Sequence, residues 1–270
     1  QYPRYPTHAA RLAVTASGAI GTPTQVQVSS TQTYHAVALM RAHLGMPLGA
    51  ARVTATAVSA PLLHPLSRAG WTGKVEPEET TTTHAVFDFG DGRSGVYDFI
   101  DQQTRNLLRF RRLAVRGTLG ELNDLDVLRW AGPETILSER IERRQSGYDL
   151  DMSGYDSETL SLGGEGLWRN PWPGNHWPDD TLATATLLRD ALAWADGSAP
   201  EPYPLAQGLQ VFLETRHRRI NAIGHPTGHQ QAANGNRLGG QQRMIDTAQP
   251  HADHQNHRQA QMHGEIGAVA

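Results

Sequence analysis

The chain has 270 residues and a formal net charge of −3, with 38% hydrophobic residues and no cysteine. This length and apolar content suffice for one large domain or two small ones. The absence of cysteine excludes disulfides and thiolate metal sites, and the charge gives no reason to expect nucleic acid as a partner. No apolar run approaches the ~18 residues of a membrane span, so we expect no membrane partner and a cytoplasmic location.

The first sixty residues carry alternating helix and strand signals. Thr7 fits a helix N-cap and Gly18 fits a stop, which predicts a helix between them. Residues 25–29 alternate polar and apolar and predict a half-buried strand. A second helix is expected over 34–44, and residues 52–58 predict another strand.

The middle of the chain is typical of strands. Asp91-Gly92 lies between the alternating runs 83–89 and 94–99, which is the chemistry expected of a tight hairpin turn. Residues 61–79 carry proline, glycine and charge without a period and predict a loop. Further strands are expected over 107–115, 121–130 and 134–144.

The last third changes character. Residues 149–166 predict an irregular acidic segment, and 168–174 an aromatic-rich loop. Two helices are expected, from Asp179 or Asp180 to Gly197 and over 204–216. Residues 217–270 are rich in glutamine and histidine and poor in large aliphatics, which predicts a disordered or loosely helical tail with no metal site. The tail histidines are His251, His254, His257 and His263.

This order of elements predicts an α+β fold, because strand runs joined by hairpins form an antiparallel sheet. We expect an open, mostly antiparallel sheet with helices packed on one face, built by residues 1–216. No Gly-x-Gly-x-x-Gly lies between a strand and a helix, so the sequence shows no dinucleotide-binding turn.

His35 is the most informative candidate for chemistry. It lies where a strand ends and a helix begins, in the run Thr31-Gln-Thr-Tyr-His35. An imidazole there can take a proton from a substrate hydroxyl. It can equally cap or pack the start of the helix, and the residues alone leave both interpretations open.

Other candidates are weaker. Tyr34 could donate a hydrogen bond to a sugar hydroxyl, and Tyr97, Asp98 and Asp101 end a strand that could reach a cleft. For each of them, packing or solvation is the simpler interpretation. The same holds for Arg109, Arg111 and Arg116, which alternate like a solvated or interface stripe, and for the aromatic rings of Trp168, Trp172 and Trp177.

Several ordered motifs resemble the C-terminal domain of Gfo/Idh/MocA oxidoreductases. An aromatic-proline opening at 2–6 leads to Ser17-Gly-Ala-Ile-Gly21. His35 then precedes Leu39-x-Arg-x-x-Leu-Gly45, and an arginine-rich strand ends in Gly117-Thr-Leu-Gly-Glu121. Residues 202–209 resemble the late helix that closes that domain. The resemblance covers roughly the first 215 residues.

The resemblance implies the substrate-side half of an NAD- or NADP-dependent sugar or polyol dehydrogenase. His35 would be catalytic, and Thr31, Tyr34 and Tyr97 would contact a polyhydroxy substrate. Thr31 stands where the family usually has Asp. The nucleotide domain, with its Glu-Lys-Pro segment, would precede Gln1, so we expect a fragment that binds no cofactor alone and forms a homo-oligomer through its open sheet face. The alternative is a non-catalytic interaction module that uses the same face.

Overall fold

The structure is a computed structural model that describes residues 1–46, 49–100, 103–147 and 154–211. The predicted tail, residues 217–270, lies outside this part, as do Asp101 and the end of the predicted helix 204–216. The described residues form an α+β fold, which confirms the predicted class. None of the described helices is both long and apolar enough to span a membrane.

Eight strands form the main sheet, in the order β10-β9-β8-β7-β1-β6-β5-β2. Only β1 and β6 run parallel; the other neighbours are antiparallel. The strands are β1 (Pro23–Val28), β2 (Arg52–Leu62), β5 (Glu78–Gly90), β6 (Arg93–Ile100), β7 (Leu113–Gly117), β8 (Gly120–Asn123), β9 (Asp126–Gly132) and β10 (Thr135–Arg140). The predicted hairpin is β5–β6, and it turns at Asp91 and Gly92 as expected.

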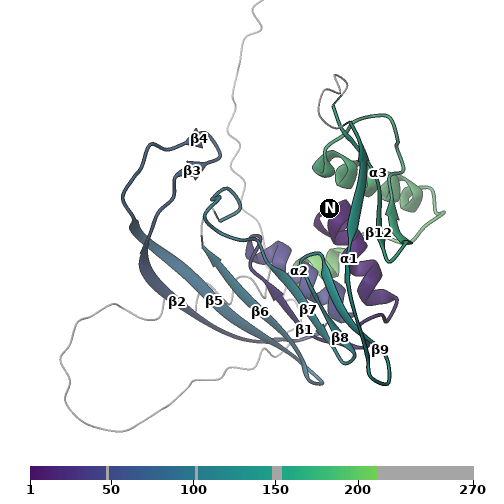
Figure 1. Cartoon of the computed structure of the whole chain (residues 1–270), viewed down its shortest axis with the longest axis horizontal. Helices are drawn as coiled ribbons and strands as arrows, with labels where there is room; N and C mark the ends of the chain where they lie inside the picture. Colours follow the sequence, from purple (N-terminus) through teal and green to yellow (C-terminus); the bar gives the residue numbers. More distant parts are fainter. Residues whose placement is uncertain (47–48, 101–102, 148–153, 212–270) are drawn as a thin grey trace, which may run out of the picture.

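Two helices cover one side of the sheet and its edge (Figure 1). A short 3-10 helix, η1 (Tyr2–Arg4), precedes α1 (Pro6–Ala16), and α2 (Thr33–Leu44) packs on β1 and β6. Gly95 of β6 leaves room for the Met40 side chain of α2, because a Cβ at Gly95 would lie 2.4 Å from the Met40 sulfur. Gly45, at φ 60°, ends α2 in the left-handed region as predicted.

The core lies between α2 and the sheet. The side chains on this face alternate with those on the opposite face, as strand geometry requires. The buried members include Val26 and Val28 of β1, Phe87 of β5, and Val115 of β7. The opposite face remains uncovered by these helices and displays large apolar side chains among polar ones: Val58, Val86, Leu128, Trp130 and Ile136.

A second, three-stranded sheet packs against α1. It consists of β11 (Glu142–Ser146), β12 (Asp156–Leu162) and β13 (Glu165–Arg169), in the order β11-β12-β13. The sequence-based prediction of irregular structure over 149–166 is therefore wrong for β12 and the start of β13. Leu160 and Leu162 of β12 are buried here, because α1 contacts β12 and β13.

Helix α3 (Asp179–Ala195) is where a helix was predicted, although Pro178 rather than an Asp is its N-cap. Its N-terminal end is bound to the rest of the fold by Arg143, which donates to both carboxylate oxygens of Asp179 at 2.8 and 2.6 Å and to Thr7 Oγ1 at 2.8 Å. A further helical segment spans 205–211, where the description ends.

Two more predictions are corrected. The segment 61–79 is not a plain loop, because β2 and β5 continue as a two-stranded ribbon whose tip carries β3 (Leu66–Ser67) and β4 (Gly70–Trp71) (Figure 1). Residues 107–112 are not a strand. Residues 107–109 form a turn and a bend, 110–112 are irregular, and β7 begins only at Leu113.

Candidate functional site

His35 lies in the first turn of α2, directly after the end of β1. The chain leaves the sheet at Val28, and the Gln32 carbonyl accepts hydrogen bonds from the amides of His35 and Ala36, both at 3.0 Å. No side-chain hydrogen bond caps this end of the helix within the described residues. The helix thereby fixes the backbone of His35 beside the end of a buried parallel strand, as the sequence predicted.

Aromatic rings surround the imidazole of His35. Tyr2 stacks on it with ring centroids 4.3 Å apart and planes 19° apart. Tyr34 contacts it at 4.1 Å with a 45° tilt. Burial lowers the pKa of His35 to about 4. The imidazole is therefore neutral at pH 7, and one ring nitrogen can accept a proton or a hydrogen bond.

The structure brings only part of the predicted set to the surface around His35. Tyr34 is 47% exposed, whereas Thr31 is 4% exposed. Tyr97 is 1% exposed, because its side chain lies on the core face of β6 near Phe99. The sequence signal at Tyr97 thus marks a packing position, and its ring does not line an open cleft.

Tyr2 is a residue of this site that the sequence reasoning did not single out. Its ring contacts His35 and also His8, at 4.8 Å. Tyr2 and His35 are far apart in sequence, so no local pattern could pair them. The aromatic-proline opening of the chain was the available signal, and η1 is the element that turns this ring toward α2.

Two more histidines are buried between α1 and the rest of the fold. His8 is 8% and His43 3% exposed. Burial and the neighbouring Arg11 guanidinium lower both pKa values to about 3. His8 Nδ1 lies 3.4 Å from Arg11 Nη1, and His43 Nδ1 lies 3.2 Å from Thr15 Oγ1. These imidazoles are neutral packing groups with no open path to a substrate.

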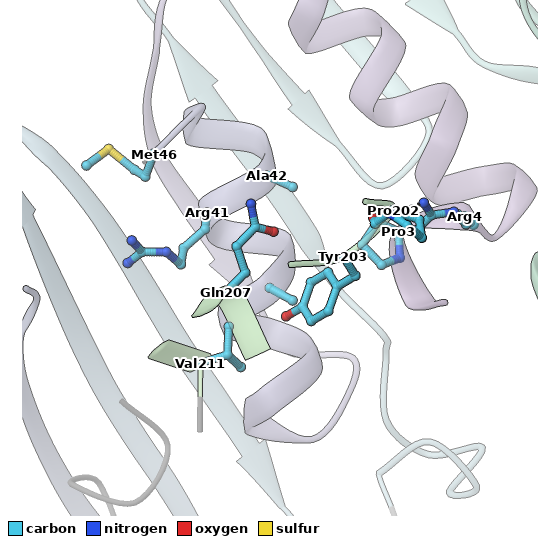
Figure 2. Close-up of a pocket in the computed structure, with 10 residues that line it drawn as sticks. Pro3, Arg4, Arg41, Ala42, Met46, Pro202, Tyr203, Gln207 and Val211 are labelled. Carbon is cyan, nitrogen blue, oxygen red and sulfur yellow. Dashed lines mark hydrogen bonds between the residues drawn. The ribbon is translucent and has the colours of Figure 1, made fainter. Parts of the chain in front are cut away.

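A pocket of about 230 Å³ runs along α2 from its middle turns toward Met46. Ala38 and Ala42 form part of its wall, one and two turns beyond His35 on the same side of the helix. Figure 2 shows the Tyr203 and Gln207 side chains at the pocket and the Arg41 guanidinium turned away from them, where it lies over the Phe89 ring at 5.5 Å. The lining contains no carboxylate and no imidazole, so this pocket supplies no acid-base group.

Asp98, Arg116 and the tryptophan loop, three of the other predicted features, are engaged in local pairs. Asp98 lies 3.9 Å from His84 Nδ1 and 3.8 Å from Arg112 Nη2 on the open face of the sheet. Arg116 is bound to Glu121 at 3.1 Å. The tryptophan loop folds on itself, with Trp172 and Trp177 5.8 Å apart. Among the described residues, no cluster of histidine and carboxylate side chains could hold a metal ion.

No protein-family model and no curated protein matches this chain. Solved structures do resemble it. Levoglucosan dehydrogenase in complex with NADH and levoglucosan aligns at 18% identity and a TM-score of 0.48 over 82% of this chain and 62% of its own. An oxidoreductase domain protein from Kribbella flavida aligns at 19% identity and a TM-score of 0.47 over 82% and 62%.

An oxidoreductase from Agrobacterium radiobacter, in complex with NAD+, L-tartaric acid and magnesium, aligns at 15% identity and a TM-score of 0.47 over 83% and 61%. The chain therefore spans about three-fifths of the length of the solved structures it resembles. All three are described as oxidoreductases.

Proposed function

We propose that this chain is the substrate-side domain of an NAD- or NADP-dependent oxidoreductase that acts on a sugar, polyol or related hydroxy compound. Its partner would be a nucleotide-binding domain, since the sequence has no dinucleotide-binding turn. The single observation that carries the proposal is a neutral imidazole, His35, fixed in the first turn of a helix at the end of a parallel strand.

The proposed chemistry follows from this placement. Hydride would pass from a carbon that bears a hydroxyl to the nicotinamide of the NAD or NADP held by the other domain, leaving a carbonyl, and the hydroxyl proton would pass to the neutral nitrogen of His35. Tyr34, exposed beside the ring, would donate a hydrogen bond to a second hydroxyl. Thr31, in place of the family's usual Asp, leaves the imidazole without a carboxylate to orient it, and the stacked Tyr2 ring is what holds it here.

The ordered motifs support the same proposal. Ser17-Gly-Ala-Ile-Gly21 forms the turn after α1, and Gly45 ends α2. Gly117 and Gly120 shape the turn between β7 and β8, where an added Cβ would meet the Ile20 and Leu128 carbonyl oxygens. The glycines of these motifs thus have structural roles at their places in the chain.

Calorimetric titration of the full chain with a panel of polyols, sugar acids and monosaccharides tests the proposal. One class should bind, and His35→Asn should weaken binding about 2- to 10-fold, the worth of one hydrogen bond. His84→Gln is the matched control, because the His84 imidazole lies on the open face of the sheet. This variant should bind the same compound as tightly as the natural chain. NAD and NADP should not bind. Micromolar affinity of this chain for either would contradict the proposal that a separate domain binds the nucleotide.

A second candidate is an interaction module that pairs through the open face of the sheet. The observation that favours it is the exposure of Leu128, Trp130 and Ile136 on adjacent strands β9 and β10. Such a patch is typical of a protein interface. If the chain self-associates in sedimentation and Trp130→Ser abolishes this, while no polyol binds, the module is the better account.

A further inference from the structure

The loop between β6 and β7 has an unusual combination of charge and exposed apolar groups. Residues 103–112, here called the basic loop, contain four arginines and no carboxylate. Arg112 lies 3.8 Å from Asp98. Within the described part of the chain, Arg105, Arg109 and Arg111 have no carboxylate within ion-pair distance. Three of the four arginines of the basic loop therefore lack a carboxylate partner among the described residues, at the edge where β6 ends.

Two buried amide side chains hold the basic loop rigidly. Gln103, 5% exposed, donates to the Ser29 carbonyl at 2.7 Å and to the Phe110 carbonyl at 3.0 Å. Asn106, 2% exposed, donates to the Leu63 carbonyl at 2.9 Å, and its own carbonyl oxygen accepts from the Leu108 amide at 2.9 Å. Buried polar side chains with this many partners specify one conformation.

The same conformation directs large apolar side chains into solvent. Leu107 is 75%, Leu108 54% and Phe110 83% exposed. The Asn106 hydrogen bond also ties the basic loop to the ribbon of β2 and β5, whose tip carries the exposed Trp71; the two segments are neighbours in Figure 1. A preorganised surface with aromatic and aliphatic anchors among arginines has the composition of a binding interface.

We propose that the basic loop docks a partner protein whose surface carries carboxylates around an apolar pocket. Charge complementarity selects this occupant. A second copy meeting the same surface across a twofold axis would bring the arginines of two basic loops together, and like-charge contact of this kind is unfavourable. The inference is independent of the dehydrogenase proposal, because the basic loop contains none of the residues assigned to substrate.

Fluorescence anisotropy with two labelled peptides tests it. One peptide alternates glutamate and leucine, and the other has glutamine in place of glutamate. The full chain should bind the acidic peptide at least tenfold more tightly, and binding should weaken as salt rises from about 50 to about 300 mM. Arg105→Glu should reduce affinity several-fold, and Leu107→Ser combined with Phe110→Ser about tenfold.

Arg140→Glu and Leu192→Ser are the matched controls, since both residues are exposed but lie outside the basic loop. They should leave affinity unchanged, and circular dichroism should verify that every variant folds. Equal losses in the controls would overturn the proposal. So would full binding by the Leu107/Phe110 variant, because the apolar anchors would then be irrelevant. Adsorption to anionic phosphatidylglycerol vesicles without peptide binding would also overturn it, in favour of a lipid surface.

Discussion

Acidification should destabilise this fold through the histidines buried beside α1. His8 and His43 have folded-state pKa values of about 3, below the ~6.5 of an unfolded imidazole. Between about pH 3 and 6.5 the unfolded chain therefore binds protons at His8 and His43 that the folded chain does not bind. The stabilisation is fully present above pH 6.5 and is lost as pH falls toward 3.

The size of the effect follows from proton linkage. Between pH 7.5 and 5.5, His8 and His43 should each lower the free energy of unfolding by about 1.4 kcal/mol. His35, whose pKa of about 4 also lies below this window but whose ring is partly exposed, adds up to about 1 kcal/mol, so the whole loss should be about 4 kcal/mol. Urea denaturation followed by tryptophan fluorescence at several pH values measures the loss directly.

His43→Leu isolates one of the two groups. His43 Nε2 is buried without a hydrogen-bond partner in the described structure, and Thr15 Oγ1 still donates to the Leu12 carbonyl, so the substitution leaves no new unpaired polar atom. The pH-dependent loss should fall by about 1.4 kcal/mol, to about 2.5 kcal/mol, because His8 and His35 remain. Val37→Ala, buried on the same helix, should lower stability equally at every pH. An unchanged pH dependence in His43→Leu would refute the reasoning.

Two further substitutions test the fold that positions the site. Gly117→Ala should destabilise the fold by about 1–3 kcal/mol, because its Cβ would lie 2.1 Å from the Ile20 carbonyl oxygen. A melting temperature equal to that of the natural chain would contradict this. Asp156→Ala should lower the free energy of unfolding by about 1–3 kcal/mol, because its buried carboxylate accepts from the Asn170 amide and the Gly174 backbone; urea denaturation with Asp156→Asn as the conservative control measures it.

The sequence predicted the elements whose ends are set by residues close together in the chain. Glycine at position 45 and the Asp91-Gly92 pair have backbone conformations that the sequence alone indicates, so α2 and the β5–β6 hairpin were foreseen. The hydrophobic alternation of β1 likewise placed His35 at a strand-to-helix junction. The fold class follows from these elements and their order.

Long-range contacts account for what was missed. Residues 107–112 mix apolar and charged side chains and suggested a strand, yet Gln103 and Asn106 bind carbonyls of distant segments and hold these residues in a turn followed by irregular chain. Strand β12 holds few aliphatics, and its core side depends on α1, more than a hundred residues away. Tyr97 looked like a cleft residue because its strand ends nearby, but the strand's twofold alternation directs it inward.

The titration of His35 tests the central claim most directly. Imidazole resonances of the full chain, recorded with and without the polyol that binds best, should give His35 a pKa near 4 in the free protein. The polyol should shift the His35 signals and leave those of His84 in place. If no hydroxy compound that binds the chain shifts the His35 resonances, His35 does not contact the substrate. Its role would then be limited to packing against Tyr2.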